Sequence, residues 1–379
     1  MHVTIHLTTS CNMRCGYCYA PPSQAMDMSL ETAERAVDFA AGFDRENNTG
    51  IIFFGGEPLL KKEVIYHTVA YCNRQRKERG RMFHFKVTTN GLLLDQAFLE
   101  FARLNRVAVA LSIDGTGAAH DTHRREASGA PTFDRVDRAA DLLLAYQPYA
   151  SALMVVSPET VGSYAESAAY LFGKGFRYLI VSFNYAGAWT GEHLRELTRQ
   201  YKRLARLYEK MTLQEKKFYL SPFEMKLATH IGGDRVQCYR CVLAQRRISV
   251  APDGSLYPCV QFVRDGVSNR EFRIGTVDSG VDETKRSALY ERSQRMTPEC
   301  EACAFKRRCH NSCSCLNRQT TGRIDTVPPV LCESERILIP IVDAMGERLY
   351  RKRAPAFIQK QYNPAYPLMS LMEDAGIAV

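Results

Sequence analysis

The chain has 379 residues, enough for about two to three domains with a sizeable core. Hydrophobic residues make up 45% and charged residues 24%, a balance that excludes a disordered, collagen-like or low-complexity chain. The formal net charge is +9, but the short basic runs lack the interleaved aromatic residues of a nucleic-acid surface, so we expect no nucleic-acid partner. No apolar run approaches the ~18 residues of a membrane helix, and residues 1–10 do not resemble a signal peptide. We therefore expect a cytoplasmic protein without a membrane partner.

Short apolar runs alternate with amphipathic stretches over the first half of the chain. Strands are predicted at Val3–Leu7, Ile51–Phe54, Phe83–Thr88, Val107–Ile113, Ala152–Val156 and Tyr178–Phe183. Helices are predicted at Leu30–Phe43, Glu63–Glu78, Asp95–Leu104, Phe133–Tyr146 and Val161–Gly173. Such alternation forms a parallel sheet with right-handed crossovers. Six units are too few for a closed eight-stranded barrel, so we predict an α/β fold with a partial, open (β/α)6 TIM-like barrel over residues 1–190.

The pattern changes after Trp189. A charged helical stretch, Glu192–Lys217, lies within a helical bridge that we place at residues 191–235. Residues 236–340 are rich in turns and cysteines and poor in apolar periodicity, so metal ligation would have to supply part of their stability. We expect residues 341–379 to form a tail that is helical at first and then irregular.

The 13 cysteines occur in groups. Three lie in residues 11–18, three in 238–259 and six in 300–332, and Cys72 stands alone. In a reducing compartment, an odd number of grouped cysteines favours metal ligation over disulfide bonds. Cys72 falls in an amphipathic helix, where we expect a small buried apolar residue.

The first group directly follows the first predicted strand and reads Cys11-Asn12-Met13-Arg14-Cys15-Gly16-Tyr17-Cys18. Three thiolates at this spacing can hold three corners of a cubane iron–sulfur cluster and leave its fourth iron open to another ligand. A zinc site, which would need a distant fourth ligand, and ordinary packing are the alternatives. The position at the carboxyl end of a strand favours the cluster.

This CxxxCxxC pattern resembles that of the radical S-adenosylmethionine (SAM) enzymes. The end of the second strand, Phe54-Gly55-Gly56-Glu57-Pro58, resembles their GGEP motif, in which glycines let backbone carbonyls approach a ligand and a carboxylate meets an ammonium group. In the subgroup that this chain resembles, a serine at the fourth strand end and an arginine twelve residues later grip the SAM carboxylate. A capping serine and a surface arginine are the alternative. The resemblance implies these SAM contacts: Tyr17, Gly55, Gly56, Glu57, Thr89, Ser112 and Arg124.

The resemblance also implies the chemistry. The open iron would chelate the methionine amine and carboxylate of SAM, and one electron would cleave a carbon–sulfur bond. The resulting 5′-deoxyadenosyl radical abstracts a hydrogen atom from the substrate. A low-potential electron donor of the flavodoxin or ferredoxin type would be a partner.

The later cysteines resemble the SPASM domain, the auxiliary-cluster extension of radical SAM peptide-modifying enzymes. Their spacing is Cys241-x12-Gly254-x4-Cys259, then Cys300-x2-Cys303-x5-Cys309-x3-Cys313, then Cys332. The resemblance implies two auxiliary clusters, and so three 4Fe–4S clusters in all. One would be held by Cys238, Cys241, Cys259 and Cys313, and the other by Cys300, Cys303, Cys309 and Cys332. Two zinc sites are the alternative. Cys315 would compete with Cys313 as a ligand or remain a free thiol near the cluster.

Three activities compete. The first is a maturase that installs a cross-link, thioether or epimerised centre in a ribosomally made precursor peptide. The second is an anaerobic sulfatase maturase, which forms formylglycine and carries an Asp after the cysteine that matches Cys259. Here that position is Val260, which cannot accept a proton, so Asp265 would have to substitute. The third, an electron carrier or zinc-stabilised module, leaves the GGEP motif unexplained.

We predict carbon–carbon or carbon–heteroatom cross-linking, because two auxiliary clusters with four thiolates each leave no open iron for a substrate cysteine. No catalytic base is predicted. The motifs start at Cys11, so we expect no N-terminal peptide-binding domain. The substrate would be held by the barrel mouth, residues 184–192, the C-terminal tail or a separate peptide-recognition protein.

Overall fold

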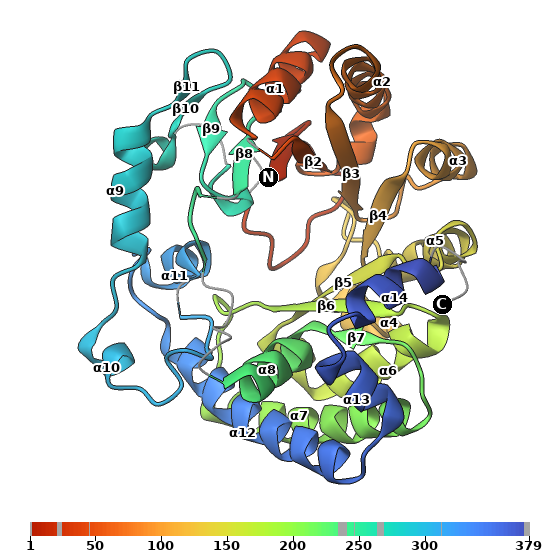
Figure 1. Cartoon of the computed structure of the whole chain (residues 1–379), viewed down its shortest axis with the longest axis vertical. Coiled ribbons are helices and arrows are strands. Elements are labelled where there is room, and N and C mark those ends of the chain that lie inside the picture. The colour runs from red at the N-terminus through yellow and green to blue at the C-terminus, as the bar shows by residue number, and fades with distance from the viewer. Residues whose placement is uncertain are drawn as a thin grey trace.

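A parallel sheet forms the centre of the molecule. The computed structural model describes residues 2–20, 25–44, 46–233, 241–245, 247–263, 269–311 and 313–374. Within these ranges the main sheet has nine strands in the order β7-β6-β5-β4-β3-β2-β1-β8-β9 (Figure 1). They are β1 (His2–His6), β2 (Asn48–Phe54), β3 (Met82–Thr89), β4 (Val107–Ser112), β5 (Ser151–Val156), β6 (Tyr178–Phe183), β7 (Tyr219–Leu220), β8 (Arg247–Val250) and β9 (Leu256–Tyr257). Each neighbouring pair among these strands is parallel except β8 with β9.

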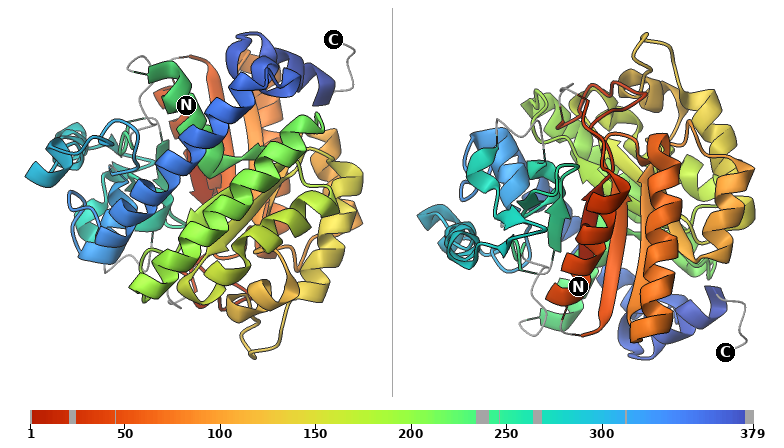
Figure 2. Two further views of the ribbon diagram at one scale, coloured as in Figure 1. Left: turned by 90° about the horizontal axis from the view of Figure 1, so that it is seen from below. Right: turned by 90° about the horizontal axis from the view of Figure 1, so that it is seen from above.

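Helices connect the parallel strands and cover the outer face of the sheet (Figures 1 and 2). They are α1 (Leu30–Phe43), α2 (Lys62–Arg79), α3 (Gln96–Leu104), α4 (Gly117–His123), α5 (Phe133–Tyr146) and α6 (Tyr164–Lys174), with 3₁₀ turns η1 (Pro58–Lys61) and η2 (Pro158–Ser163). Local signals set their ends: the Ser29 side chain accepts the Thr32 amide at the start of α1, and Gly80 ends α2 with φ of 65°. The predicted partial barrel is therefore confirmed.

Several elements differ from the sequence prediction. The predicted helix 161–173 begins instead as η2 and becomes α-helical only at Tyr164. The short helix α4 was not predicted, because seven residues carry too little periodicity. Strand β8 was also missed. It comes from the cysteine-rich half of the chain and pairs in parallel with β1, so the second half of the chain extends the sheet of the first.

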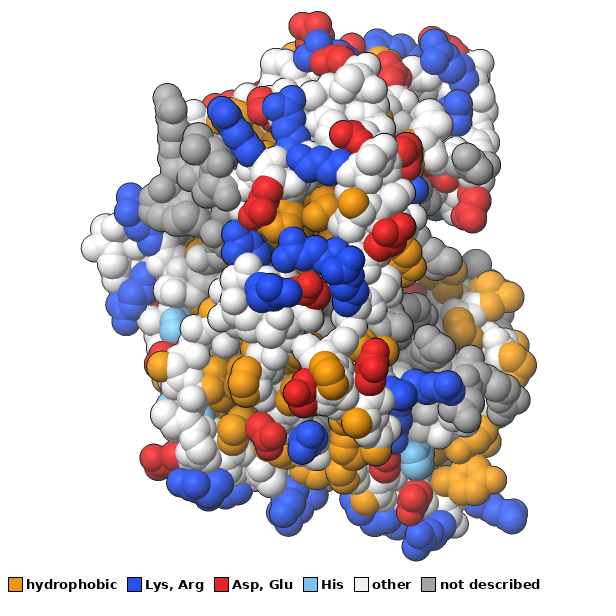
Figure 3. Space-filling view, turned by 90° about the vertical axis from the view of Figure 1, so that its left-hand side faces the viewer, with side chains coloured by type: hydrophobic (Ala, Val, Ile, Leu, Met, Phe, Trp, Pro, Cys, Tyr) orange, Lys and Arg blue, Asp and Glu red, His pale blue; other side chains and the backbone are white. Residues whose placement is uncertain are grey.

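The rest of the chain is largely helical. It contains α7 (Gly191–Leu213), α8 (Ser221–Gly232), α9 (Glu283–Ser293), α10 (Pro298–Glu301), α11 (Ser314–Thr321), α12 (Pro329–Arg351), α13 (Pro355–Tyr362) and α14 (Tyr366–Asp374), the hairpin of β10 (Gly275–Thr276) and β11 (Gly280–Val281), and 3₁₀ turns η4 (Val260–Phe262) and η5 (Arg270–Phe272). Helix α12 packs along α7 and α8 (Figure 2). Lys and Arg side chains gather on the face that carries α9 and α10 (Figure 3).

Helix α12 crosses residue 340, where a domain boundary was expected, and the division into domains stays a prediction. The expected irregular tail was wrong, since α13 and α14 continue to Asp374. Short helices depend on tertiary contacts more than on their own sequence. Here Arg177 and Tyr178 bind the Asp374 carboxylate. Among the described helices, none is long and apolar enough to cross a bilayer.

Candidate active site and cysteine centres

The first cysteine group lies on the loop that follows β1, at the carboxyl end of the sheet. The end of β2 supports this loop: the Gly56 amide donates to the Thr8 carbonyl at 2.9 Å, and the Glu57 amide donates to the Ser10 carbonyl at 2.9 Å. A Cβ atom on Gly55 would lie 2.4 Å from the Thr8 oxygen, and one on Gly56 would lie 2.1 Å from the Ser10 oxygen. Both glycines are therefore required for the close approach of the two backbones, a role that comes in addition to the predicted approach to a ligand.

The Glu57 side chain turns into the protein. It is 1% exposed and accepts hydrogen bonds from the Leu59 amide at 3.0 Å, the Thr89 hydroxyl at 2.7 Å and the Asn90 amide at 2.7 Å. Burial raises the pKa of Glu57 to about 7, although these donors oppose the shift. These hydrogen bonds join the ends of β2 and β3. The contacts of Glu57 with an ammonium group and of Thr89 with SAM stay predictions.

Asn90 connects the end of β3 to the cysteine loop. Its side-chain Nδ2 donates to the side-chain Oδ1 of Asn12 at 2.7 Å and lies 3.7 Å from the Cys11 sulfur. Its own side-chain Oδ1 accepts a hydrogen bond from the Leu92 amide at 3.1 Å. Sequence reasoning selected Thr89 at this strand end and missed Asn90, although the residue stands in the same Thr-Thr-Asn-Gly stretch. An amide can donate and accept at once, which suits a residue that joins two loops.

The end of α4 and the segment after it support the other side of the cysteine loop. The Arg14 amide donates to the Arg125 carbonyl at 2.8 Å, and the Gly16 amide donates to the His123 carbonyl at 3.1 Å. Cys11 and Cys18 are exposed, and Cys15 is partly buried. All three thiols therefore belong to one loop that is fixed by β2, β3 and the segment after α4.

Arg124 is buried beside this loop. It is 6% exposed, and its Nε donates to the Asp114 carboxylate at 3.0 Å. The Tyr17 hydroxyl donates to the same carboxylate, and the guanidinium lies 5.4 Å from the centre of the Tyr17 ring. Burial raises the pKa of Cys15, and the nearby Arg124 charge opposes this shift. Arg124 is thus not the surface arginine of the alternative interpretation.

Asp114 is a site residue that the sequence analysis did not select. It follows the end of β4 by two residues, and its second oxygen accepts the Val155 amide at 2.9 Å. The predicted contact Ser112 ends the same strand. Ser112 and Arg124 therefore belong to the same region, but the contacts described for Arg124 are with Asp114, Tyr17 and Cys15. The sequence feature that could have indicated Asp114 was its position in the Ser-Ile-Asp-Gly stretch at the end of β4.

A buried histidine fixes the backbone at Arg124. The ring of His120 is fully buried, and desolvation together with the nearby Arg124 charge lowers its pKa to about 4. The ring is therefore neutral at pH 7. Its Nδ1 accepts the Asp114 amide at 3.3 Å, which leaves Nε2–H to donate to the Thr132 hydroxyl at 3.1 Å. That hydroxyl donates in turn to the Arg124 carbonyl.

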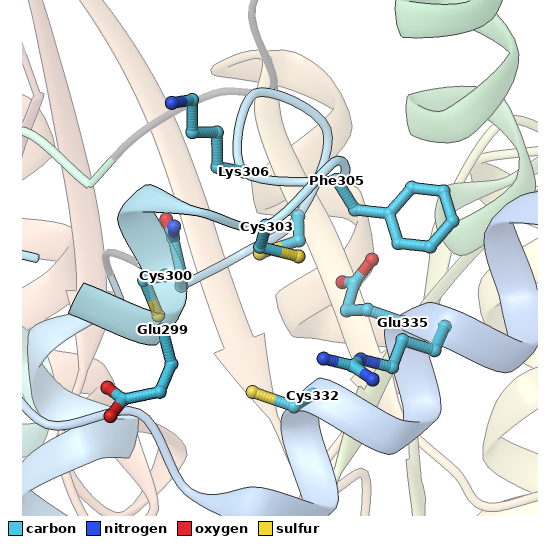
Figure 4. Close-up of a pocket in the computed structure, with 10 residues that line it drawn as sticks. Glu299, Cys300, Cys303, Phe305, Lys306, Cys332 and Glu335 are labelled. Atoms are coloured by element: carbon cyan, nitrogen blue, oxygen red, sulfur yellow. The ribbon is translucent and has the colours of Figure 1, made fainter. Parts of the chain in front are cut away.

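Four cysteines line a pocket between α10 and the start of α12 (Figure 4). They are the set predicted for one auxiliary cluster: Cys300, Cys303, Cys309 and Cys332. The sulfur atoms of Cys300, Cys303 and Cys332 point toward the same space, a cavity of about 60 Å³. The structure brings these thiols together, and their ligation of a cluster stays a prediction.

The other auxiliary group lies in a separate small core. Cys241, Cys259 and Cys313 pack around a set of buried residues that includes Leu243 and Tyr257. Cys313 therefore packs beside Cys241 and Cys259, which are distant in the chain, and not beside the nearer Cys300 and Cys303. The family resemblance implies the same grouping. Cys238, the fourth predicted ligand, and Asp265, the possible substitute base, lie outside the described residues. Cys72 is fully buried, as expected.

Among the described residues, no group of three His, Cys, Asp or Glu side chains is arranged closely enough to hold a metal ion. Zinc takes four ligands around a single ion, whereas each thiolate of a cubane occupies its own corner. The preference for clusters over zinc at the two cysteine centres therefore stays a prediction. The twelve described cysteines are all free of disulfide bonds.

Comparison with known proteins finds one matching family model and several proteins of similar sequence. The sequence model of the Radical SAM superfamily matches residues 5–171. A cysteine-type anaerobic sulfatase-maturating enzyme of Clostridium perfringens (strain 13) is 24% identical over 325 residues, which cover 81% of this chain and 86% of that protein. A serine-type anaerobic sulfatase-maturating enzyme of Klebsiella aerogenes is 25% identical over 342 residues, which cover 83% and 80%.

Two solved structures share the fold. His6-tagged anSMEcpe with bound AdoMet has a TM-score of 0.79 at 22% identity and covers 99% of this chain and 98% of its own. Streptococcus suis SuiB bound to its precursor peptide SuiA has a TM-score of 0.60 at 15% identity, covering 87% and 75%.

Proposed function

We propose that this chain, which belongs to the radical SAM superfamily, oxidises a side chain of a peptide or protein substrate. One observation carries the proposal: a three-cysteine loop at the carboxyl end of β1 is fixed by the ends of β2 and β3, and two further groups of cysteines follow it. Membership of the superfamily implies SAM and a SAM-binding 4Fe–4S cluster. Relatives that modify peptides and proteins support the substrate class.

The donor set of the loop fits such a cluster. Cys11, Cys15 and Cys18 offer three thiols from eight residues of chain, and the backbone beside them is kept free of side chains by Gly55 and Gly56. When bound, the cluster and SAM would together supply a 5′-deoxyadenosyl radical for hydrogen abstraction.

The chain's own residues bind and orient SAM. We propose that the Gly55 and Gly56 carbonyls approach its amine and that Ser112 and the Arg124 guanidinium face its carboxylate. Asp114 and the Tyr17 ring hold the guanidinium in place. Glu57, Thr89 and Asn90 act through the loops that they join, so we assign them positioning roles.

The other cysteines support an oxidation rather than a simple hydrogen exchange. We propose two auxiliary 4Fe–4S clusters, one on Cys300, Cys303, Cys309 and Cys332 and one on Cys238, Cys241, Cys259 and Cys313. Redox groups of this kind suit a reaction that removes electrons from the substrate. Lys and Arg side chains gather on the face shown in Figure 3, with some Asp and Glu side chains among them. We propose that an acidic, low-potential electron donor docks on this face, because opposite charge favours its approach.

Two finer activities remain, and each has its own support. The named relatives at 24% and 25% identity favour formylglycine formation in a sulfatase. The residue after Cys259 favours peptide cross-linking, because the isopropyl group of Val260 cannot accept a proton. Both activities begin with removal of a hydrogen atom from a substrate side chain, and this shared step is the proposed function.

The test uses anaerobic, cluster-loaded enzyme with SAM and a reductant. It is given peptides from sulfatases, with Cys or Ser at the modified position, and any short precursor peptide encoded beside the gene. Formylglycine from Ser loses two hydrogens, and formylglycine from Cys also exchanges sulfur for oxygen; both products react with a hydrazide. A cross-link loses two hydrogens and gives no hydrazide adduct, whereas deuterium uptake from the solvent without another mass change indicates epimerisation. The proposal fails if SAM is cleaved and every peptide stays unchanged, or if a variant with Ala at Cys11, Cys15 and Cys18 keeps its activity.

A further inference from the structure

Cys315 is a buried thiol in contact with the first auxiliary group, which we define as Cys241, Cys259 and Cys313 together with the undescribed Cys238. Its sulfur lies 3.6 Å from the sulfur of Cys313 and also forms a hydrogen bond with Cys259. The residue is 8% exposed. It belongs to the same small core as Leu243, so water has little access to it. The family resemblance leaves this thiol without a role.

The geometry distinguishes a hydrogen-bond donor from a ligand. Two thiolates on different irons of a cubane are kept apart by the cluster between them, so they are not in direct contact. A sulfur–sulfur distance of 3.6 Å is instead that of a hydrogen bond between two thiols. Cys313 precedes α11 as its N-cap, and Cys315 is the second residue of that helix. The short helix therefore holds the Cys315 thiol against its neighbour.

We propose that Cys315 is not a ligand but a positioning residue, whose S–H group donates a hydrogen bond to the cluster-binding sulfur of Cys313 or Cys259. This inference rests on the proposed role of those two cysteines as ligands. A hydrogen bond to a ligand sulfur stabilises the more negative, reduced form of an iron–sulfur cluster. Cys315 therefore raises the reduction potential of the first auxiliary cluster and makes that cluster a better electron acceptor.

The experiment compares Cys315→Ala and Cys315→Ser with the wild type as anaerobic, cluster-loaded full-length protein. Iron and acid-labile sulfide are counted per chain, and the auxiliary clusters are titrated potentiometrically with detection by electron paramagnetic resonance. Both variants should keep the wild-type iron and sulfide content. In the alanine variant the potential of one auxiliary cluster should shift to a more negative value, and in the serine variant the hydroxyl donor should restore most of it. Cys72→Ala, which removes a fully buried thiol elsewhere in the protein, should change neither quantity.

Three results would overturn the inference. Loss of one cluster's iron in both Cys315 variants would make Cys315 a ligand. An unchanged potential in the alanine variant would show that the thiol does not act on the cluster. Wild-type protein with iron for only the SAM-binding cluster would remove the ligand roles of Cys259 and Cys313. SAM cleavage and peptide oxidation by the same wild-type sample test the proposed function separately, since either can fail while the potential shift remains.

Discussion

The buried Glu57 carboxyl should make the stability of the protein depend on pH. Burial raises its pKa from 4.5 to about 7. Between these two values the unfolded chain has already released the proton that the folded chain still holds, so stability decreases as the pH rises. The full decrease in the free energy of unfolding is about 3 kcal/mol, and about 2.5 kcal/mol of this decrease occurs between pH 5 and pH 8.

Glu57→Gln removes this titration. The variant also loses one acceptor for the three donors around the side chain, which costs about 1–3 kcal/mol at every pH. A chain of 379 residues has an unfolding entropy of about 0.8 kcal/mol/K. The unfolding temperature of the wild type should therefore fall by about 3 °C more than that of the variant between pH 5 and pH 8.

Thermal unfolding of the anaerobic holoprotein at a fixed scan rate measures this difference. Glu63→Gln is the matched control, because Glu63 is an exposed carboxylate near the start of α2, close in the chain to Glu57. The unfolding temperature of Glu63→Gln should change with pH in the same way as that of the wild type. Parallel curves for the wild type and Glu57→Gln would show that Glu57 stays ionised over the whole range, and the reasoning from burial would then be refuted.

Three further changes test other contacts. Lys226→Met leaves the buried Glu335 without the ammonium group 2.6 Å away, so the free energy of unfolding in urea should fall by about 3–5 kcal/mol. The second change Glu335→Leu should recover most of this loss, and equal instability of the single and double variants would contradict the prediction. Gly56→Ala places a Cβ 2.1 Å from a backbone oxygen of the cysteine loop and should lower the iron content, whereas Gly42→Ala, with no atom within 4 Å of the new Cβ, should not. Asn90→Asp removes a hydrogen-bond donor to the cysteine loop and adds a negative charge beside it. The Kd for SAM measured by calorimetry should therefore rise about tenfold, and an unchanged Kd would exclude the positioning role.

The sequence by itself determined the elements and motifs whose signals are local. Helix α1 has the predicted bounds because a capping serine and a regular apolar face define it within its own residues. The partial barrel follows from the alternation of strands and helices. The cysteine groups could be recognised because the predicted ligands within one loop keep a fixed spacing along the chain, as in residues 11–18 and 300–309.

The tertiary structure decided which side chains face one another. The Glu57 side chain accepts a hydrogen bond from Thr89, 32 residues away, and the role proposed for Cys315 rests on its contacts with Cys313 and Cys259. Strand β8 pairs with β1 although more than 240 residues separate their sequences. These contacts depend on the path of the backbone between elements that are distant in the chain. No local periodicity or spacing carries that information, because it is set by the packing of the whole sheet and its helices.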